Sequence, residues 1–247
     1  PDSFKEILRQ YQEEDFRLDY EYRRFYSAYD QLEETAAFEP LRDLVENIYT
    51  NEYLEMLLPK WNAAIQEPDA FMALPLQRDF YARNLKNAKE RTVVIISDAM
   101  RYEVSKELFR RIQDDPKCTA KLEVQLGVLP SYTRLGMAAL LPHTELTMTD
   151  DFKVLVDGFP CENLAEREAI LQKYSSDSAC VQFDSIKSLK IADLRSIFTG
   201  KQVVYVYHNQ IDARGDKPNT EDEVFVACQE AITEIIDLIR RISTSAN

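Results

Sequence analysis

The sequence feature that most constrains the fold of this chain is an uninterrupted apolar run that leads to a carboxylate. Val93-Val94-Ile95-Ile96 is followed by Ser97 and Asp98, and an apolar run of β-branched residues predicts a buried strand of a parallel sheet. Open α/β sheets bind their ligands at the carboxyl ends of such strands. Asp98 therefore has two interpretations: an oxygen ligand of a metal ion, or the cap of the helix that follows.

From Arg91 onward, strand patterns and helix patterns alternate. The strand candidates are Thr92–Ser97, Leu122–Leu126, Lys153–Val156, Cys180–Phe183 and Gln202–Tyr207. The helix candidates are Tyr102–Gln113, Thr133–Leu141, Leu164–Tyr174, Ile191–Phe198 and Glu221–Ile242. Apolar strands separated by helices predict an α/β fold, in which helices cover both faces of a mostly parallel sheet.

Residues 1–90 carry a different pattern. An apolar stripe recurs there at helical intervals, and it consists of Leu8, Tyr11, Leu18, Tyr22, Phe25, Tyr29 and Leu32. Further helical stretches follow, with breaks at Pro68 and Pro75. We therefore expect an α-helical region over residues 1–90, a bundle or cap, and a separate α/β domain over residues 91–247.

Composition restricts the partners and the compartment. The 247 residues include 30 basic and 43 acidic side chains, so the formal charge of −13 repels nucleic acid and does not indicate nucleic-acid binding. No apolar run approaches the roughly 20 residues of a membrane helix, and no signal peptide pattern occurs at the start. Four cysteines without a CxxC pair are typical of ordinary thiols in a reducing cytoplasm.

A second polar segment follows the apolar strand that ends at Tyr207. It contains His208, Asp212 and Asp216, and such a loop at a sheet edge can bring imidazole and carboxylate ligands together. A structural role for a lone histidine is equally compatible with the residues. His143, in a predicted loop after Pro142, lacks comparable neighbours and is predicted to lie at the surface or in a local turn.

Thr133 is the predicted first residue of a helix. Backbone N–H groups and the helix dipole favour an anion there, so the Thr133 hydroxyl could attack a phosphoryl group. The alternative is that Thr133 only caps the helix or belongs to a turn after Pro130. The sequence has no Walker loop, GxGxxG or GxSxG motif, which argues against a phosphate-cradling loop and against a serine hydrolase elbow.

Three segments together resemble the PglZ proteins of bacterial BREX phage-defence systems, which are members of the alkaline phosphatase superfamily. They are Ile96–Glu103, Pro130–Pro142 and Tyr205–Asp216, and Asn163–Leu171 is also similar to that family. The resemblance covers residues 91–247 and implies an alkaline-phosphatase-like core with a site for divalent metal ions. Zinc is the expected ion, with manganese or magnesium as alternatives.

The resemblance also implies roles for individual residues. In that superfamily, an aspartate after the first strand binds a metal, a Thr or Ser after a Pro-x-x turn is the nucleophile, and a later Asp/His pair spaced by four residues binds a second metal. Carried over, Asp98 is a ligand, Thr133 is the nucleophile and also a metal contact, and His208 with Asp212 is the later pair in reversed order. Asp216 is a further candidate ligand.

One element of the superfamily is missing, because the Asp-His dipeptide that completes its first metal site occurs nowhere in this sequence. We therefore expect an incomplete core, truncated at its C-terminal end. Such a fragment of a larger PglZ-type protein is expected to be weakly active or inactive by itself and to bind divalent metal poorly, with its metal site unoccupied.

The expected function is that of part of a metal-dependent phosphatase or phosphodiesterase in antiviral defence. Arg134 and Arg101 are the candidates for binding phosphate oxygens, because a guanidinium fork matches their geometry. Other BREX proteins are the expected partners, with no membrane involved and the cytoplasm as location. Two alternatives remain: a non-catalytic binding or scaffold module of the defence complex, and a metal-dependent nuclease.

Overall fold

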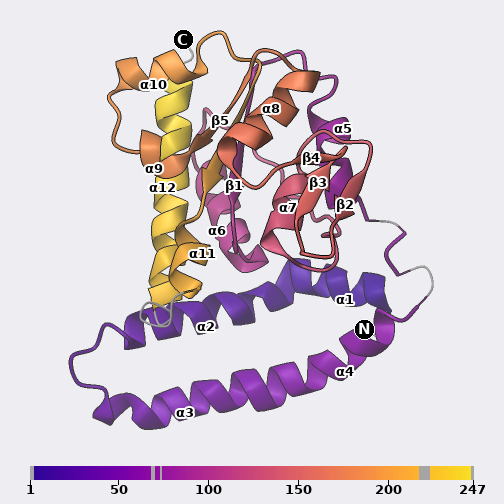
Figure 1. Cartoon of the computed structure of the whole chain (residues 1–247). Coiled ribbons are helices and arrows are strands. Elements are labelled where there is room, and N and C mark those ends of the chain that lie inside the picture. Colours follow the sequence, from indigo (N-terminus) through magenta and orange to yellow (C-terminus); the bar gives the residue numbers. More distant parts are fainter. Residues whose placement is uncertain (1–2, 68–69, 73, 217–222, 246–247) are drawn as a thin grey trace. The chain divides into compact units, whose positions relative to one another are not determined.

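The structure is a computed structural model that describes residues 3–67, 70–72, 74–216 and 223–245 (Figure 1). Contacts divide the chain into two compact units. The helical unit comprises Pro1–Ala73, Met100–Leu122 and Arg214–Glu230, and the sheet unit comprises Leu74–Ala99, Glu123–Ala213 and Ala231–Asn247. Both units are therefore built from several chain segments, whereas the sequence pattern predicts a single boundary after residue 90.

Three parallel strands form the centre of the sheet unit. Their order is β1 (Thr92–Ser97), β6 (Val203–His208) and β5 (Ser178–Gln182). The β1–β6 pairing runs from Thr92 opposite Val203 to Ser97 opposite His208. All six residues of β6 are buried, as expected for a strand with neighbours on both sides. The predicted parallel sheet is confirmed.

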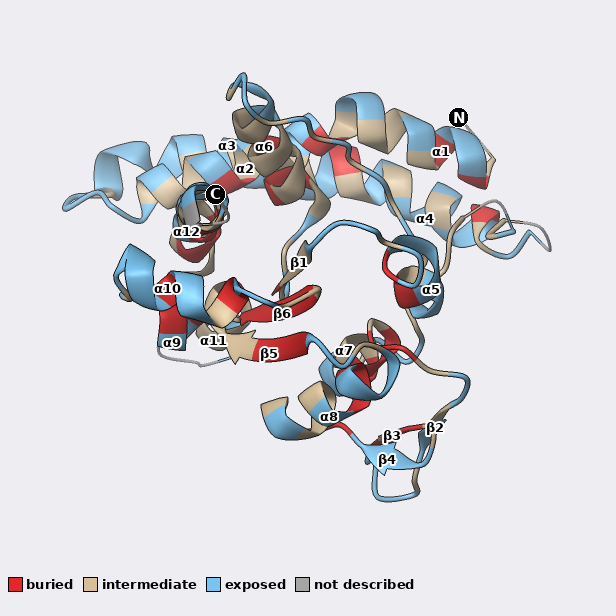
Figure 2. Ribbon diagram, turned by 90° about the horizontal axis from the view of Figure 1, so that it is seen from above, coloured by how far each residue is buried: buried red, intermediate tan, exposed pale blue. Residues whose placement is uncertain are grey.

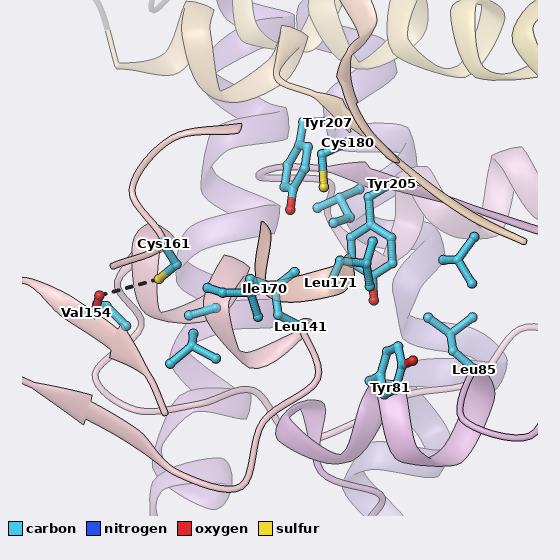
Figure 3. Close-up of a cluster of buried hydrophobic side chains, with 14 of the residues drawn as sticks. Tyr81, Leu85, Leu141, Val154, Cys161, Ile170, Leu171, Cys180, Tyr205 and Tyr207 are labelled. Carbon is cyan, nitrogen blue, oxygen red and sulfur yellow. Dashed lines mark hydrogen bonds between the residues drawn. The ribbon is translucent and has the colours of Figure 1, made fainter. Parts of the chain in front are cut away.

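One face of this sheet is covered by α7 (Thr133–Ala139) and α8 (Leu164–Tyr174), together with residues of α5 (Phe80–Asn84). Tyr205 and Tyr207 of β6 point to this face, because alternate residues of a strand share a side. The Tyr205 hydroxyl donates a hydrogen bond to the backbone carbonyl of Leu140, at 2.6 Å. Figure 3 shows this cluster, with Tyr81 and Leu85 at one end and Tyr207 at the other.

The opposite face of the sheet packs against α9 (Phe183–Ile186), α10 (Ile191–Phe198) and the part of α12 (Val224–Ser245) that carries Leu238. Val204 and Val206 of β6 point to this side. Figure 1 shows α9, α10 and α12 on one side of the strands and α7 and α8 on the other, and Figure 2 shows burial concentrated in β5 and β6. The prediction that helices cover both faces of the sheet is confirmed.

A second sheet is small and antiparallel. It consists of β2 (Leu146–Met148), β3 (Val154–Val156) and β4 (Phe159–Pro160), in that order. Asp157 and Gly158 join β3 to β4 with φ angles of 49° and 78°. A two-residue hairpin turn needs positive φ at both positions, and Asp-Gly is one of the residue pairs that favour this conformation. The predicted strand over Lys153–Val156 therefore exists, but its place in the parallel sheet was wrong.

The strand predicted over Leu122–Leu126 is also wrong. This segment has no extended ladder, and a single parallel bridge links Leu126 to Leu76. Its alternation of apolar and polar residues indicates which side chains could share a face, but a strand also needs a partner backbone in register. Leu76 supplies that partner at one position only.

The helical unit contains α1 (Phe4–Gln10), α2 (Phe16–Tyr29), α3 (Glu39–Asn47), α4 (Glu55–Ala64) and α6 (Tyr102–Gln113). Short π-helical segments, Tyr11–Asp15 and Ile48–Leu54, connect α1 to α2 and α3 to α4. Phe4 of α1 packs against the rings of Trp61 and Phe71, with centroids 5.2 and 5.0 Å apart. The described part of residues 1–73 contains no strand, and its predicted helical character is confirmed.

A buried ion cluster joins α2 to α6. Arg23 is 1% exposed, and its Nε lies 2.9 Å from Oε2 of Glu103, while its Nη2 lies 2.8 Å from Oε2 of Glu107. Burial raises the pKa of Glu103 above its usual value despite the nearby guanidinium. Burial also acts to raise the pKa of Glu107, but hydrogen bonds from Arg23 and Arg111 outweigh it and lower the pKa.

Arg23→Ala should destabilise the helical unit by about 3–5 kcal/mol, because it leaves two buried carboxylates without their partner. Arg24→Ala is the matched control. Arg24 is exposed and forms a solvent-exposed ion pair with Glu21, at 3.8 Å. Loss of such a pair should lower the free energy of unfolding by about 0.5 kcal/mol or less. Urea unfolding of both variants, followed by circular dichroism, measures the difference. Equal losses for the two variants would contradict the assignment.

Candidate active site

The carboxyl ends of β1 and β6 place Asp98 and His208 side by side. The Asp98 N–H donates to the His208 carbonyl at 3.0 Å and so continues the ladder by one residue. At Ala99 the chain turns with a φ of 59°, and the Ala99 N–H donates to Oδ1 of Asp98 at 3.0 Å. Arg101, not Asp98, occupies the N-cap position of α6. The helix-cap interpretation of Asp98 is therefore not what the structure shows.

His208 is almost fully buried, at 1% exposure, and both of its ring nitrogens have partners. Nδ1 lies 3.0 Å from Oγ of Ser97, and Nε2 lies 3.0 Å from Oε2 of Glu234 on α12. The ring of Phe183 packs edge-on against the imidazole, with centroids 4.7 Å apart. The imidazole thus connects β1, β6 and α12, and in this arrangement neither nitrogen offers a lone pair to a metal ion.

The protonation state of His208 follows from these partners. Burial lowers the pKa of His208 below its ordinary value of 6.5, although Glu234 acts in the opposite direction. The ring is therefore neutral near neutral pH. Since a carboxylate can only accept, Nε2 carries the proton and donates to Glu234, and Nδ1 accepts from the Ser97 hydroxyl.

Asn209 follows His208 and is a candidate that the sequence analysis did not assign. Its Oδ1 is buried and has no hydrogen-bond partner among the described residues. By extension of the register, Asn209 lies opposite Asp98. An amide oxygen beside a carboxylate suits a hard divalent cation, and a polar residue directly after a buried strand is the signal that could have identified it.

Asp212 and Asp216 lie further along the chain. Asp212 is half-buried in α11 (Gln210–Gly215), the helix that follows β6. Asp216 is exposed, in the turn that ends α11, and belongs to the helical unit, whereas Asp212 belongs to the sheet unit. Of the two, only Asp212 lies in the same compact unit as Asp98.

Thr133 is the first residue of α7, as predicted, and it is exposed. The N-cap position belongs to Tyr132, so the Thr133 hydroxyl does not cap this helix. The Tyr132 N–H donates to the Pro130 carbonyl at 2.8 Å, which holds the turn before the helix. The hydroxyl makes no hydrogen bond to another described residue and stands in the same unit as Asp98.

The two candidate arginines lie in different units. Arg134 follows Thr133 on α7, and its Nη1 lies 3.0 Å from Oε1 of Glu162. Arg101 lies in the helical unit, with its guanidinium 6.0 Å from the centroid of the Phe225 ring.

The described residues contain no cluster of three or more His, Cys, Asp or Glu side chains that could hold a metal ion. Two oxygen-bearing residues, Asp98 and Asn209, nevertheless follow directly after the adjacent strands β1 and β6. His143, predicted to lie at the surface or in a local turn, is partly buried, and its Nδ1 donates to the Leu141 carbonyl at 2.7 Å.

Comparison with protein families decides the affiliation. The family described as "BREX system PglZ alkaline phosphatase-like domain" matches residues 79–247. This chain belongs to the PglZ family. The match begins within the segment that leads into α5, and so includes every strand of both sheets. The family resemblance inferred from the three sequence segments is confirmed.

Two curated PglZ-family proteins are similar to this chain over nearly its whole length. The alkaline phosphatase-like protein PglZ of Bacillus cereus (strain H3081.97) is 39% identical over 244 residues, which is 96% of this chain and 29% of that protein. The alkaline phosphatase-like protein BrxZ of Escherichia coli O9:H4 (strain HS) is 37% identical over 246 residues, which is 94% of this chain and 28% of that protein. The chain therefore spans less than a third of the length of these relatives.

No solved structure matches this PglZ chain. Within the described residues, no helix combines the length and the apolar character that crossing a membrane would require.

In metal-free buffer, the His208 ring should titrate with a midpoint below 6.5, because burial disfavours its charged form. The unfolded chain then binds more protons than the folded chain, so the contribution of His208 to stability is complete above pH 6.5 and is lost as the pH falls from there toward the folded pKa. NMR of the imidazole Cε1–H resonances measures the midpoint, and His143→Gln assigns the two signals. A midpoint above 6.5 would refute the burial argument.

Proposed function

We propose that this chain carries part of the active site of a metal-dependent phosphoesterase that acts in BREX defence. The family supports this reaction class, and one observation carries the assignment. Asp98 and the amide oxygen of Asn209 stand at the ends of two paired strands, at the edge where α/β sheets bind their ligands.

The donor atoms of this edge favour a hard cation. Asp98, Asn209 and Asp212 would supply oxygen ligands, while His208 would hold the ends of β1 and β6 in place through Ser97 and Glu234. Oxygen donors suit magnesium or manganese better than zinc, which more often takes nitrogen or sulfur. We therefore favour manganese or magnesium over the zinc expected from the family resemblance.

In the proposed reaction, the exposed Thr133 hydroxyl gives its proton to solvent water, and its oxygen attacks phosphorus. An oxygen–phosphorus bond forms at Thr133 while the bond to the leaving oxygen breaks, and water then hydrolyses the phosphothreonine. A bound divalent ion would lower the pKa of the hydroxyl and offset the charge on the leaving oxygen. A phosphomonoester and a phosphodiester are both compatible substrates.

Arg134 is the proposed clamp on the phosphate oxygens. Its ion pair with Glu162 is half-exposed, and exposed pairs contribute about 1 kcal/mol or less. A substrate phosphate could therefore displace Glu162 at little cost. Arg101 is a weaker candidate because it belongs to the other compact unit.

Thr133→Ala in the complete natural protein should lower kcat by about a hundredfold or more, because it removes the attacking oxygen. The matched control is Thr147→Ala, an exposed threonine of β2 that should leave kcat unchanged. Hydrolysis of p-nitrophenyl phosphate and bis(p-nitrophenyl) phosphate, each with manganese, magnesium or zinc, measures the effect. Full activity of Thr133→Ala would refute the nucleophile assignment.

A second candidate function, a scaffold within the defence complex, rests on a different observation. The helix α3 has no buried residue, and along one side it exposes Leu41, Leu44 and, directly after its last residue, Ile48. Such spacing forms one helical face, and exposed apolar patches commonly bind other proteins. Other BREX proteins are the proposed partners.

Leu44→Asp should abolish co-purification of the complete protein with other BREX components if α3 is a docking face, since it places a charge in an apolar interface. Glu52→Asp, a conservative change at an exposed position beyond α3, is the control. Hydrolytic activity should be unaffected by either substitution. Unchanged co-purification of Leu44→Asp would contradict the scaffold role.

The cytoplasm is the proposed site of action. All four cysteines, Cys118, Cys161, Cys180 and Cys228, are free thiols. Persistent free thiols are typical of a reducing compartment.

A further inference from the structure

The sheet unit contains a large hollow that includes none of the residues of the proposed active site. Its volume is about 930 Å³, and it lies along α5 and the segments that flank α7. Asp98, Thr133 and His208 do not line it. Binding sites for small molecules usually fall in the range of about 300–1,000 Å³, so the hollow has the size of a ligand site.

The walls of the hollow are held by specific contacts. Gln77 bridges three backbone positions: its N–H donates to the Leu126 carbonyl at 2.9 Å, its Nε2 donates to the Gly136 carbonyl at 3.1 Å, and its Oε1 accepts from the Val128 N–H at 3.1 Å. These bonds join the segment before α5 to both sides of the Pro130 turn. The hollow is therefore formed before any ligand arrives.

Two aromatic rings belong to the lining. Tyr81 and Tyr174 meet edge to face, with centroids 6.0 Å apart, and the Tyr174 hydroxyl donates to Oδ2 of Asp157 at 3.0 Å. Tyr81 is buried, whereas Tyr174 is 50% exposed. Part of the Tyr174 surface is therefore open to contact, and an exposed aromatic ring stacks readily on planar ligand rings.

The charge of the lining is opposite to that of the chain. Arg78, Lys86 and His143 line the hollow together with a single carboxylate, Asp79, although the chain as a whole carries −13. Arg78 and Lys86 are exposed, and within the described part of the chain neither takes part in an ion pair. Both cations are therefore available to an anion, and a guanidinium binds phosphate oxygens through two parallel hydrogen bonds.

From these features we infer that the hollow is a second ligand site, for a small anion that carries a planar ring, of the nucleoside monophosphate class. Buried Leu135 and Leu141 provide the apolar floor, Tyr174 stacks on the ring, and Arg78 with Lys86 bind the phosphate. Side chains hold the phosphate here, which agrees with the lack of a glycine-rich phosphate loop in the sequence. The site goes beyond the proposed phosphoesterase function.

Isothermal titration of the chain with AMP, adenosine and inorganic phosphate tests the inference. We expect saturable binding of AMP, and weaker binding of adenosine and of phosphate, because each of these lacks half of the contacts. Arg78→Gln and Lys86→Gln should each weaken AMP binding about tenfold, the loss expected for one charge-assisted hydrogen bond. Lys153→Gln, at an exposed lysine of the same unit outside the hollow, should leave AMP binding unchanged.

Methyl NMR locates the bound ligand independently of the substitutions. AMP should shift the methyl resonances of Leu135 and Leu141 and leave those of Leu238, on the other face of the sheet, in place. Absence of saturable AMP binding, or shifts confined to residues outside the hollow, would overturn the site. Adenosine or phosphate binding as tightly as AMP would overturn the ligand class.

Discussion

The central strand β6 is the element on which the sheet unit depends. It pairs on both sides and buries all six of its residues, so each face requires a layer of apolar side chains. Tyr205 and Tyr207 meet one layer, and Val204 and Val206 meet the other. Core residues of α5, α7 and α8 pack on one face and those of α9, α10 and α12 on the other, so the segments around β6 form a three-layer structure.

The end of β6 shows how the same strand determines the site. The side chain of its last residue, His208, points to the same side of the strand as those of Val204 and Val206. The His208 ring therefore packs in the layer that contains Phe183 and α12. A histidine buried there must satisfy both nitrogens, and Ser97 and Glu234 do so. The proposed ligands are instead the residues just past the last strand pair, Asp98 and Asn209, where the chain leaves the sheet.

The helical unit is stabilised in a different way. Its helices bury fewer large apolar side chains, and the best-buried contact between α2 and α6 is the ion cluster of Arg23, Glu103 and Glu107. Removing any single member of this cluster would leave a buried charge unpaired, whereas the intact cluster itself adds little net stability. The apolar side of α3 stays exposed, which fits a surface that meets other proteins.

The sequence by itself determined the local elements and the family. The helices Tyr102–Gln113, Leu164–Tyr174 and Ile191–Phe198 and the strand Thr92–Ser97 occur where the pattern predicts them, because short-range periodicity and caps decide them. The segments that begin at Ile96, Pro130 and Tyr205 indicated the PglZ family. These features depend on residues close together in the chain.

Only the tertiary structure decided the partners of those elements. Glu234 follows His208 by 26 positions, and no spacing rule connects them, so the sequence left the structural and the metal-binding roles of His208 open. The strand Val154–Val156 belongs to a separate small sheet and is linked to its neighbour by the Asp157-Gly158 turn. The segment Leu122–Leu126 has no partner strand. Pairing and burial depend on which distant backbones meet, and a one-dimensional pattern of apolar residues does not contain that information.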